Sequence, residues 1–557
     1  MKNILIAIRS IFKKGRHNVM KIVSLGIGLA VGLVLIAKVY FEQSYDDFYP
    51  DRDRVYQVWA KYQQNGGELK DYPQTSGGIA PTMQQQIPEI ETVTRYTSFG
   101  DWTFTMTDTK MKYSGRCIIA DSCFFDILPR PMLIGNAKEV LSTPMYVLVS
   151  SRIAKNIGGD VIGKNFTVDS SPGRTMTIGG VFEEVPENSH SRYDVIVSMA
   201  SAGRFMWEGS PTNMLGNDRY ISYVKLHKGV NPLALEEQVH TFVNSYFPPE
   251  EQQKTGFNIG FSFHELDGLH KELPQVKRMT WILSLLAFAL IFTAVMNYIL
   301  IVISSIVNRS KEVAVHKCYG ASENNIHGMM FGEALVHIVL SLILALLLIL
   351  AFRGTVEELL ATSLDSLLLS NGSLVLLGIC ILVFFVSGFM PGSLYARIPV
   401  ASAFRNYREN KRIWKKALLL VQFVATGFLV TMLVFVARQY TFMVNDRPGY
   451  AYENLAYCGL AGVDSTSRAK ILDEVMRLPG VVAATTVYQL PFEHASGNNI
   501  LLPGETQELF NIADLYWVGN GYLDMMEIPV IQGRSFTENV TNSREVMVDR
   551  RFVEKMK

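Results

Sequence analysis

The chain has 557 residues, of which 48% are hydrophobic and 18% charged, and its formal net charge is +1. Without an excess of basic residues there is no bulk electrostatic footprint for nucleic acid, so we expect no nucleic-acid partner. The composition is uneven along the chain, because nearly charge-free apolar runs separate two long stretches of ordinary soluble composition, 41–278 and 438–557.

Five apolar runs are long enough to cross a bilayer, which takes about 20 helical residues. They are Lys21–Tyr40, Met279–Ser304, Met330–Phe352, Gly372–Met390 and Ala417–Ala437. The first run has a basic flank like that of a signal peptide, but its apolar core exceeds the usual length of about 7–15 residues, and we expect it to be retained. The expected fold class is an α-helical multi-pass membrane protein whose spans contact membrane lipid.

Basic residues gather on alternate sides of these runs. The segments 1–20, 305–329 and 391–416 are rich in Lys and Arg, whereas the loop 353–371 carries Glu357, Glu358 and Asp365 against a single Arg353. By the positive-inside rule the three basic segments are cytoplasmic. The stretches 41–278, 353–371 and 438–557 are then extracytoplasmic. We therefore expect a multi-pass protein of the inner (cytoplasmic) membrane with a cytoplasmic N-terminus.

Both soluble stretches mix short helical and strand-like patterns, separated by Gly, Pro and Asn turns. In 41–278, a helix is expected near Pro81–Gln86, and strands at Ile87–Thr94, Met145–Val149, Asn165–Val168 and Thr175–Val181. In 438–557, a helix is expected at Ser467–Arg477 and a β-rich segment at Val481–Tyr488. This alternation is typical of α+β domains.

The two soluble stretches also resemble each other in order and spacing. Three segments of the first stretch parallel three of the second: Ile87–Val93 and Leu478–Ala484, Phe125–Leu128 and Leu523–Met526, Val147–Ile157 and Val546–Met556. We interpret this as an internal duplication of a unit made of a span and a soluble domain. The first copy continues well beyond the last matched segment, whereas the second stops there, so we expect the chain to be truncated at its C-terminal end.

No catalytic or metal-binding spacing is present in the sequence. Gly158–Lys164 reads GGDVIGK but is followed by Asn165 instead of the Ser or Thr of a phosphate loop, and a turn explains both glycines. The histidines form no HExxH or i,i+4 pair. We therefore expect no enzyme activity, metal or cofactor in this chain.

Three smaller features leave alternatives open. Glu333 and His337 lie one turn apart near one end of the third span, where they serve either a proton relay or helix packing. Cys117 and Cys123 either form a disulfide or remain two thiols. Gly28 and Gly32 form a GxxxG pair, which either packs closely on a neighbouring helix or reflects the general abundance of glycine in membrane helices.

The bridge between the second and third spans, Asn308–Ile326, reads NRSKEVAVHKCYGASENNI and is itself a good helix. Gly320 is suited to end this helix in the left-handed conformation. Ser322 is suited to N-cap the next helix, with Glu323 in its favourable first turn. The sequence therefore predicts a helical loop with a defined turn, held on a membrane hairpin.

The residues Arg309–Ser322 resemble the R-x-x-E-I-x-x-x-K-x-x-G-A-S loop of MacB/FtsX-type ABC transporter permeases, and Phe331–Ala334 resembles the F-x-x-E-A that follows it. Further stretches resemble the Bacteroidetes branch of that family, whose extracytoplasmic domains are MacB-like periplasmic core domains. These stretches are Ile8–Lys14, Tyr45–Phe48, Arg54–Tyr56, Pro186–His190 and Gly388–Pro399. His316, Cys318 and Tyr319 depart from the commonest residues of the loop.

The resemblance implies that the bridge is a coupling helix that docks on a separate cytoplasmic ATPase, where ATP would be bound. The docking or turn-setting residues would be Arg309, Lys311, Glu312, Lys317, Gly320, Ala321 and Ser322. It also implies a homodimer or heterodimer of permeases, a periplasmic adaptor as a further partner, and eight spans in the full-length form.

The function expected from this resemblance is that of a permease subunit in an ABC transport system. It would transmit ATP-driven motion to the extracytoplasmic domains, for export or extraction of a drug, peptide or lipoprotein. Two alternatives remain open: a signal transducer that controls a cell-envelope enzyme or sensor kinase without transport, and a non-functional fragment.

Overall fold

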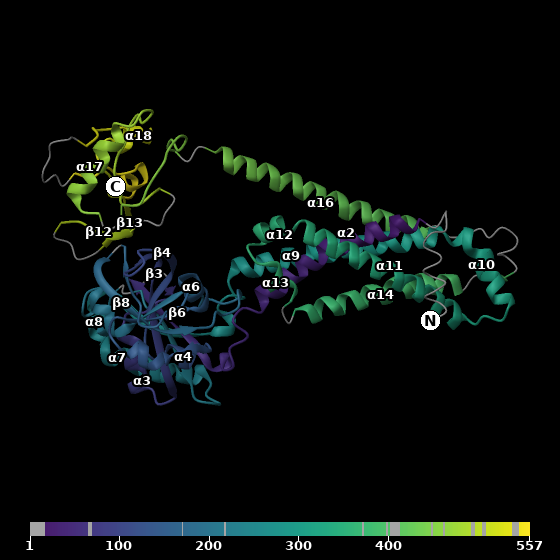
Figure 1. Ribbon diagram of the computed structural model, residues 1–557, viewed down its shortest axis with the longest axis horizontal. Helices are drawn as coiled ribbons and strands as arrows, with labels where there is room; N and C mark the ends of the chain where they lie inside the picture. The colour runs from purple at the N-terminus through teal and green to yellow at the C-terminus, as the bar shows by residue number, and fades with distance from the viewer. Residues whose placement is uncertain are drawn as a thin grey trace. The chain divides into compact units, whose positions relative to one another are not determined.

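A computed structural model of the chain describes residues 17–64, 69–169, 171–216, 219–369, 372–396, 399–400, 413–446, 449–460, 463–491, 496–503, 508–536 and 545–556 (Figure 1). Contacts divide the chain into two units. The first comprises Met1–Val168 and Gly173–Leu429, and the second comprises Asp169–Pro172 and Val430–Lys557.

All five expected spans are helices that are long and apolar enough to cross a membrane. They are α2 (Asn18–Gln43), α9 (Pro274–Ser304), α11 (Glu323–Ala351), α14 (Ser373–Ala396) and α16 (Ile413–Asn445). Each helix begins or ends outside the apolar run that predicted it, because polar residues next to a span can extend the backbone hydrogen bonding of its helix. The N-terminal basic residues before His17 lie outside the described part of the chain.

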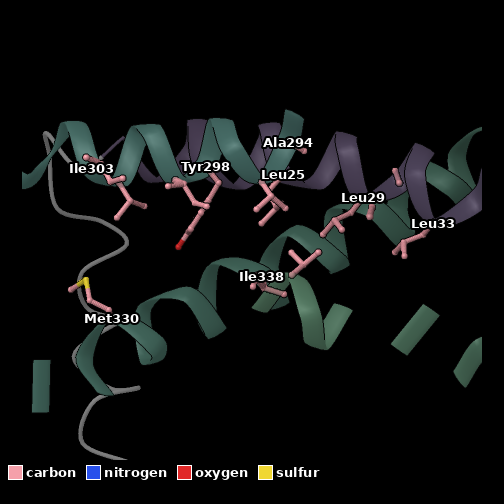
Figure 2. Packing of buried hydrophobic residues seen from close by; sticks show 14 of the residues in the cluster. Leu25, Leu29, Leu33, Ala294, Tyr298, Ile303, Met330 and Ile338 are labelled. Atoms are coloured by element: carbon pink, nitrogen blue, oxygen red, sulfur yellow. The ribbon is translucent and has the colours of Figure 1, made fainter. Parts of the chain in front are cut away.

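Helices α2, α9, α11 and α14 share one buried cluster (Figure 2). Leu25, Leu29 and Leu33 project from one side of α2, at the four-residue spacing that places side chains on one helix face. Figure 2 shows them near Ala294 and Tyr298 of α9, with Ile338 of α11 close by. Leucines that recur on one face of α2 thus bury that face against two other spans.

The first soluble stretch forms a mixed sheet. Its strands are β1 (Val55–Gln64), β2 (Lys70–Tyr72), β3 (Ile90–Met106), β4 (Lys112–Ala120), β5 (Met132–Ile134), β6 (Tyr146–Ser150), β7 (Asn165–Val168), β8 (Ser171–Phe182), β9 (Val195–Ser198), β10 (Ile221–Leu226) and β11 (Phe257–Glu265). Their order is β11-β1-β10-β3-β4-β9-β6-β8-β5, with β2 beside β1 and β7 beside both β3 and β8. The pairs β4–β9 and β6–β8 are parallel, and the other described pairs are antiparallel.

Short helices pack on this sheet. They are α3 (Ile79–Gln86), α4 (Phe124–Ile127), α5 (Ala137–Ser142), α6 (Ser151–Ile157), α7 (Glu236–Tyr246) and α8 (Pro249–Thr255), with 3-10 turns η1 (Arg52–Arg54), η2 (Met199–Arg204), η3 (Ser210–Thr212), η4 (Pro232–Leu235) and η5 (Leu266–Gly268). Side-chain caps set several starts: Asn136 accepts from Lys138 N and Glu139 N at α5, and Ser150 accepts from Ile153 N at α6. The expected α+β class is confirmed, and the expected helix at Pro81–Gln86 and the four expected strands correspond to α3, β3, β6, β7 and β8.

The loop between the third and fourth spans contains two helices that the sequence did not predict, α12 (Arg353–Leu360) and α13 (Leu364–Leu368). Ser363 N-caps α13 by accepting from Ser366 N. Leu364 and Leu367 are buried, and both belong to clusters that include residues of α2. This loop therefore folds against the membrane helices.

The second unit contains α17 (Ser465–Met476), β12 (Ser496–Leu501), β13 (Glu508–Leu515), α18 (Tyr522–Met525) and α19 (Arg550–Lys555). The expected helix at Ser467–Arg477 corresponds to α17. The prediction of a β-rich segment at Val481–Tyr488 is wrong, because its described residues form only one isolated bridge, between Val487 and Val518. A strand needs a neighbouring ladder for its backbone groups, and β propensity alone does not supply one.

Matched positions of the two soluble stretches adopt the same local structure. The Phe125–Leu128 and Leu523–Met526 segments both enter short helices, α4 and α18, and the glycines that follow, Gly135 and Gly533, have φ of 85° and 91°. Ser150 caps α6, and its counterpart Asp549 caps α19 by accepting from Phe552 N. The turns and caps of the proposed repeat thus recur.

Candidate functional site

The bridge between the second and third spans is helix α10 (Ile306–Cys318), separated from α9 by Ser305. Its carboxyl end is closed by two crossed hydrogen bonds, Ala321 N to His316 O at 3.0 Å and Gly320 N to Lys317 O at 3.0 Å. Gly320 has φ of 87°, and this combination is a Schellman motif. Ser322 then accepts from Asn325 N and starts α11, with Glu323 in the first turn. Gly320, Ala321 and Ser322 therefore fix the angle between α10 and α11.

One side of α10 is anchored to the membrane helices. Val313 and Ala314 are each 1% exposed and belong to the same cluster as the spans. Lys317 Nζ donates to Ala396 O at the end of α14, at 2.6 Å. Tyr395, one residue earlier, donates to Val302 O at 3.1 Å, at the corner where α9 turns into α10. These contacts make α10 a firmly held extension of the membrane helices.

The opposite side of α10 is exposed. We define the α10 face as Lys311, Val315, His316 and Tyr319, all of which are exposed, with Tyr319 at 89%. Of the sequence-predicted residues with described side chains, Lys311 is exposed on this face, Glu312 lies next to it and is half-buried, and Lys317 points to α14. Arg309 lies in α10, but its side chain is outside the described part of the structure.

A buried ion pair lies among the spans near α10. Lys21 of α2 and Glu333 of α11 are 3.5 Å apart, with side chains 1% and 7% exposed. One turn further along α11, His337 Nδ1 lies 3.1 Å from the hydroxyl of Tyr298 on α9. Glu333 and His337 thus both connect α11 to other spans. Contacts of this kind are those expected if the two residues serve helix packing. No sequence pattern pointed to Lys21 as a partner of Glu333, because Lys21 is one of the basic residues that flank the first span.

Gly28 and Gly32 both face α9. A Cβ added at Gly28 would lie 2.2 Å from the Cβ of Ala294, and one at Gly32 would lie 2.4 Å from Cγ1 of Ile291. Real side-chain atoms cannot approach so closely, so the two helices contact each other at distances that require glycine.

At the other end of α2, charged groups connect the spans to the soluble domain. Lys38 Nζ lies 2.7 Å from Oε1 of Glu42 and donates to Oγ1 of Thr362 at 2.8 Å. His270, just before α9, contacts Glu42 through Nε2 at 2.5 Å. The ring of Tyr45 stacks on His270 with centroids 3.7 Å apart. The end of α2, the loop after α11 and the approach to α9 thus meet at one place.

The segment Pro186–His190 contacts the same place. Asn188 Nδ2 donates to Ser44 O at 2.6 Å, and Ser189 Oγ donates to Oδ1 of the buried Asp46 at 2.6 Å. Glu187 Oε2 accepts from Ser363 N at 3.0 Å. We call these contacts the junction. It joins the soluble domain to α2 and to the α12–α13 loop.

Other sequence candidates have simpler structural explanations. Cys117 and Cys123 are unpaired thiols, so the disulfide alternative is wrong. Gly158, Gly159 and Gly163 have positive φ, as expected for a turn between α6 and β7. Among the described residues, no group of three or more His, Cys, Asp and Glu side chains is placed to hold a metal ion.

The geometry defines a multi-pass membrane protein with an extracytoplasmic α+β domain and a helical loop at the opposite end of its spans. The family described as the MacB-like periplasmic core domain matches residues 20–242, and the family described as the FtsX-like permease C-terminal matches residues 284–400. The two matches together take in most of α2 and of the first soluble domain, and the hairpin that carries α10. The chain therefore belongs to the MacB/FtsX-type ABC transporter permeases.

Three solved structures are similar to parts of the chain. A domain described as that of a permease protein from Porphyromonas gingivalis is 32% identical, with 39% of this chain and 91% of that chain covered and a TM-score of 0.36. The periplasmic region of MacB from Actinobacillus actinomycetemcomitans is 16% identical, with 37% and 87% covered and a TM-score of 0.27. The extracellular domain of the noncanonic ABC-type transporter YknZ from Gram-positive bacteria is 10% identical, with 38% and 98% covered and a TM-score of 0.26. No curated protein matches the chain.

Proposed function

We propose that this chain is the permease subunit of an ABC transport system, and that it transmits the ATP-driven motion of a separate ATPase to its extracytoplasmic domains. Permeases of this family work with a cytoplasmic ABC ATPase. The observation that carries the proposal is the two-sidedness of α10. One side is held by Val313, Ala314 and Lys317, and the other presents an exposed aromatic and basic surface. A surface of this kind suits docking, because aromatic anchors contribute most to interface energies.

The proposal extends to sidedness and partners. The N-terminus and α10 are cytoplasmic, and the protein resides in the inner membrane. The chain has no enzyme activity or cofactor of its own, since the ATPase subunit binds and hydrolyses ATP. A second permease, identical or different, completes a dimer, and a periplasmic adaptor receives the motion when the substrate is exported or extracted.

Site-specific photo-crosslinking tests the docking surface. A photoreactive residue replaces Tyr319, and in a matched chain it replaces Leu369, which is 81% exposed in the loop after α11. We expect the first chain to crosslink to a protein that mass spectrometry identifies as an ABC ATPase, and the second chain not to do so. Crosslinking of the ATPase from both positions, or from neither, would contradict the proposal.

Charge reversal on α10 tests the coupling. We expect Lys311→Glu and Glu312→Arg to abolish stimulation of the ATPase activity in reconstituted membranes, with insertion intact. Lys254→Glu, at an exposed helical lysine of the soluble domain, is the matched control and leaves the activity unchanged. Unchanged coupling in both α10 variants would rule out docking through this helix.

A further inference from the structure

A cavity of about 270 Å³ in the first soluble domain is lined by four arginines. Arg116 lies on β4, Arg130 follows α4, Arg152 lies on α6, and Arg192 precedes β9. Residues that are distant in sequence thus bring four guanidinium groups to one place. We call this cavity the arginine pocket.

Arg130 is the unusual member of the pocket. It is 6% exposed, and its Nε and Nη2 atoms have no hydrogen-bond partner among the residues that the structure describes. Its guanidinium lies among aromatic rings, with centroids at 5.1 Å for Phe182 and 5.9 Å for both Phe124 and Tyr193. Burial lowers the pKa of this guanidinium, against the opposing effect of nearby tyrosines. A buried cation with two unused donors is costly unless an anion accompanies it.

Three carboxylates line the pocket beside the four arginines, and two of them, Glu184 and Asp194, are already engaged, whereas the third belongs to Asp101. Arg152 pairs with Asp194 at 2.5 Å and with Glu184 at 3.4 Å. Asp194 Oδ2 also accepts from Arg116 N at 2.9 Å. The side chains of Arg116 and Arg192 form no ion pair in the described part of the chain. Positive charge is therefore in excess around the two unused donors of Arg130.

We propose that the arginine pocket binds a phosphate group. Guanidinium groups match the oxygens of phosphate in paired, charge-assisted hydrogen bonds, and a phosphate offers enough acceptors for Arg116, Arg130 and Arg192 together. The cavity is many times the volume of about 10–15 Å³ that admits one water, so it also accommodates a small organic substituent on the phosphate. The phosphate comes either from a soluble phosphate compound or from a lipid headgroup.

Isothermal titration calorimetry of the full chain in dodecyl maltoside tests the site, with inorganic phosphate as titrant and chloride at equal ionic strength as reference. We expect saturable binding of one phosphate. Arg116→Ser and Arg192→Ser each weaken it by about tenfold or more, the usual effect of losing a charge-assisted hydrogen bond. Arg204→Ser removes the same charge from an exposed position on η2, outside the pocket lining, and leaves the affinity within about twofold.

Arg130→Met removes the buried guanidinium and should abolish binding. This variant can also disturb the surrounding aromatic rings. If it does not fold, the variants Arg116→Ser and Arg192→Ser, at exposed positions, still test the proposal. Absence of saturable binding to the unmodified chain would overturn the proposal and leave water as the occupant of the pocket. An equal loss of affinity in Arg204→Ser would overturn it as well, since binding would then follow overall charge.

The source of the phosphate is tested by repeating the titration in nanodiscs that contain phosphatidylglycerol. If a headgroup already occupies the pocket, inorganic phosphate binds at least about tenfold more weakly there than in detergent, and Arg192→Ser reduces the amount of lipid retained on purification. If the affinity is unchanged, the ligand is a soluble phosphate compound.

Discussion

Lys21 and Glu333 form an ion pair that is almost completely buried between α2 and α11. Removing one partner of such a pair leaves an uncompensated charge and typically costs about 3–5 kcal/mol, whereas replacing both with apolar residues is often nearly neutral. We therefore expect Lys21→Met to lower the unfolding temperature in detergent, and Lys21→Met combined with Glu333→Leu to recover most of the loss. Lys311→Met, at an exposed position, is the control. A double variant no more stable than the single one would contradict this role.

Cys117 is fully buried on β4, and burial raises the pKa of its thiol well above the usual value. Because the thiolate is the reactive form, the folded protein should hide this residue from alkylating reagents at pH 8. We expect iodoacetamide to modify the exposed Cys318 and Cys458 within minutes and to leave Cys117 unmodified until the protein is denatured, as measured by peptide mass spectrometry. Modification of Cys117 at the rate of Cys458 would show that the sheet opens at β4.

At the scale of elements, close contact between α2 and α9 depends on glycine. Gly28→Ala places a methyl group 2.2 Å from the Cβ of Ala294, and overpacking of this kind costs about 1–3 kcal/mol. We expect a lower midpoint of thermal unfolding in detergent, and partial recovery when Ala294→Gly is added. Gly378→Ala on α14 is a matched control, because its added Cβ would meet nothing within 4 Å. Equal effects of the two glycine substitutions would exclude a specific contact.

The elements show which features could be predicted from the sequence. Apolar length predicted the five spans, because about 20 apolar helical residues are needed to cross a bilayer. Gly320 and Ser322 predicted the turn after α10, because both residues act through local backbone geometry. The helices α12 and α13 were missed, because they are too short for a periodic pattern and are held by contacts with α2.

The side-chain partners of the site could not be predicted in the same way. Lys317 matched a family motif, but its bond to Ala396 O depends on where α14 ends. The arginine pocket gave no sequence signal, because its four arginines come from different elements and meet only in the folded sheet. Tertiary contacts of this kind have no fixed spacing along the chain.

For the whole molecule, the exposed Cys318 and Cys458 offer a test of membrane topology. In single-cysteine chains in intact spheroplasts, we expect a membrane-impermeant maleimide to label Cys458, and to label Cys318 only after permeabilisation. A chain that retains only the buried Cys117 is the control and stays unlabelled in both conditions. Labelling of Cys318 in intact spheroplasts would reverse the orientation inferred from the positive-inside rule.

The pairing of β1 with β11 limits how the membrane helices can move. The soluble domain is inserted between α2 and α9, and the strands that follow and precede these helices form an antiparallel ladder from Tyr56–Glu265 to Gln64–Phe257. Lengthwise sliding of α2 past α9 would have to break this ladder and force Gly28 and Gly32 past the side chains of α9. Sliding of the two helices is therefore opposed at two places, in the sheet beyond one end of α2 and near the middle of α2. We therefore expect the two helices to tilt or turn together, and the sheet attached to them to move with them as one piece.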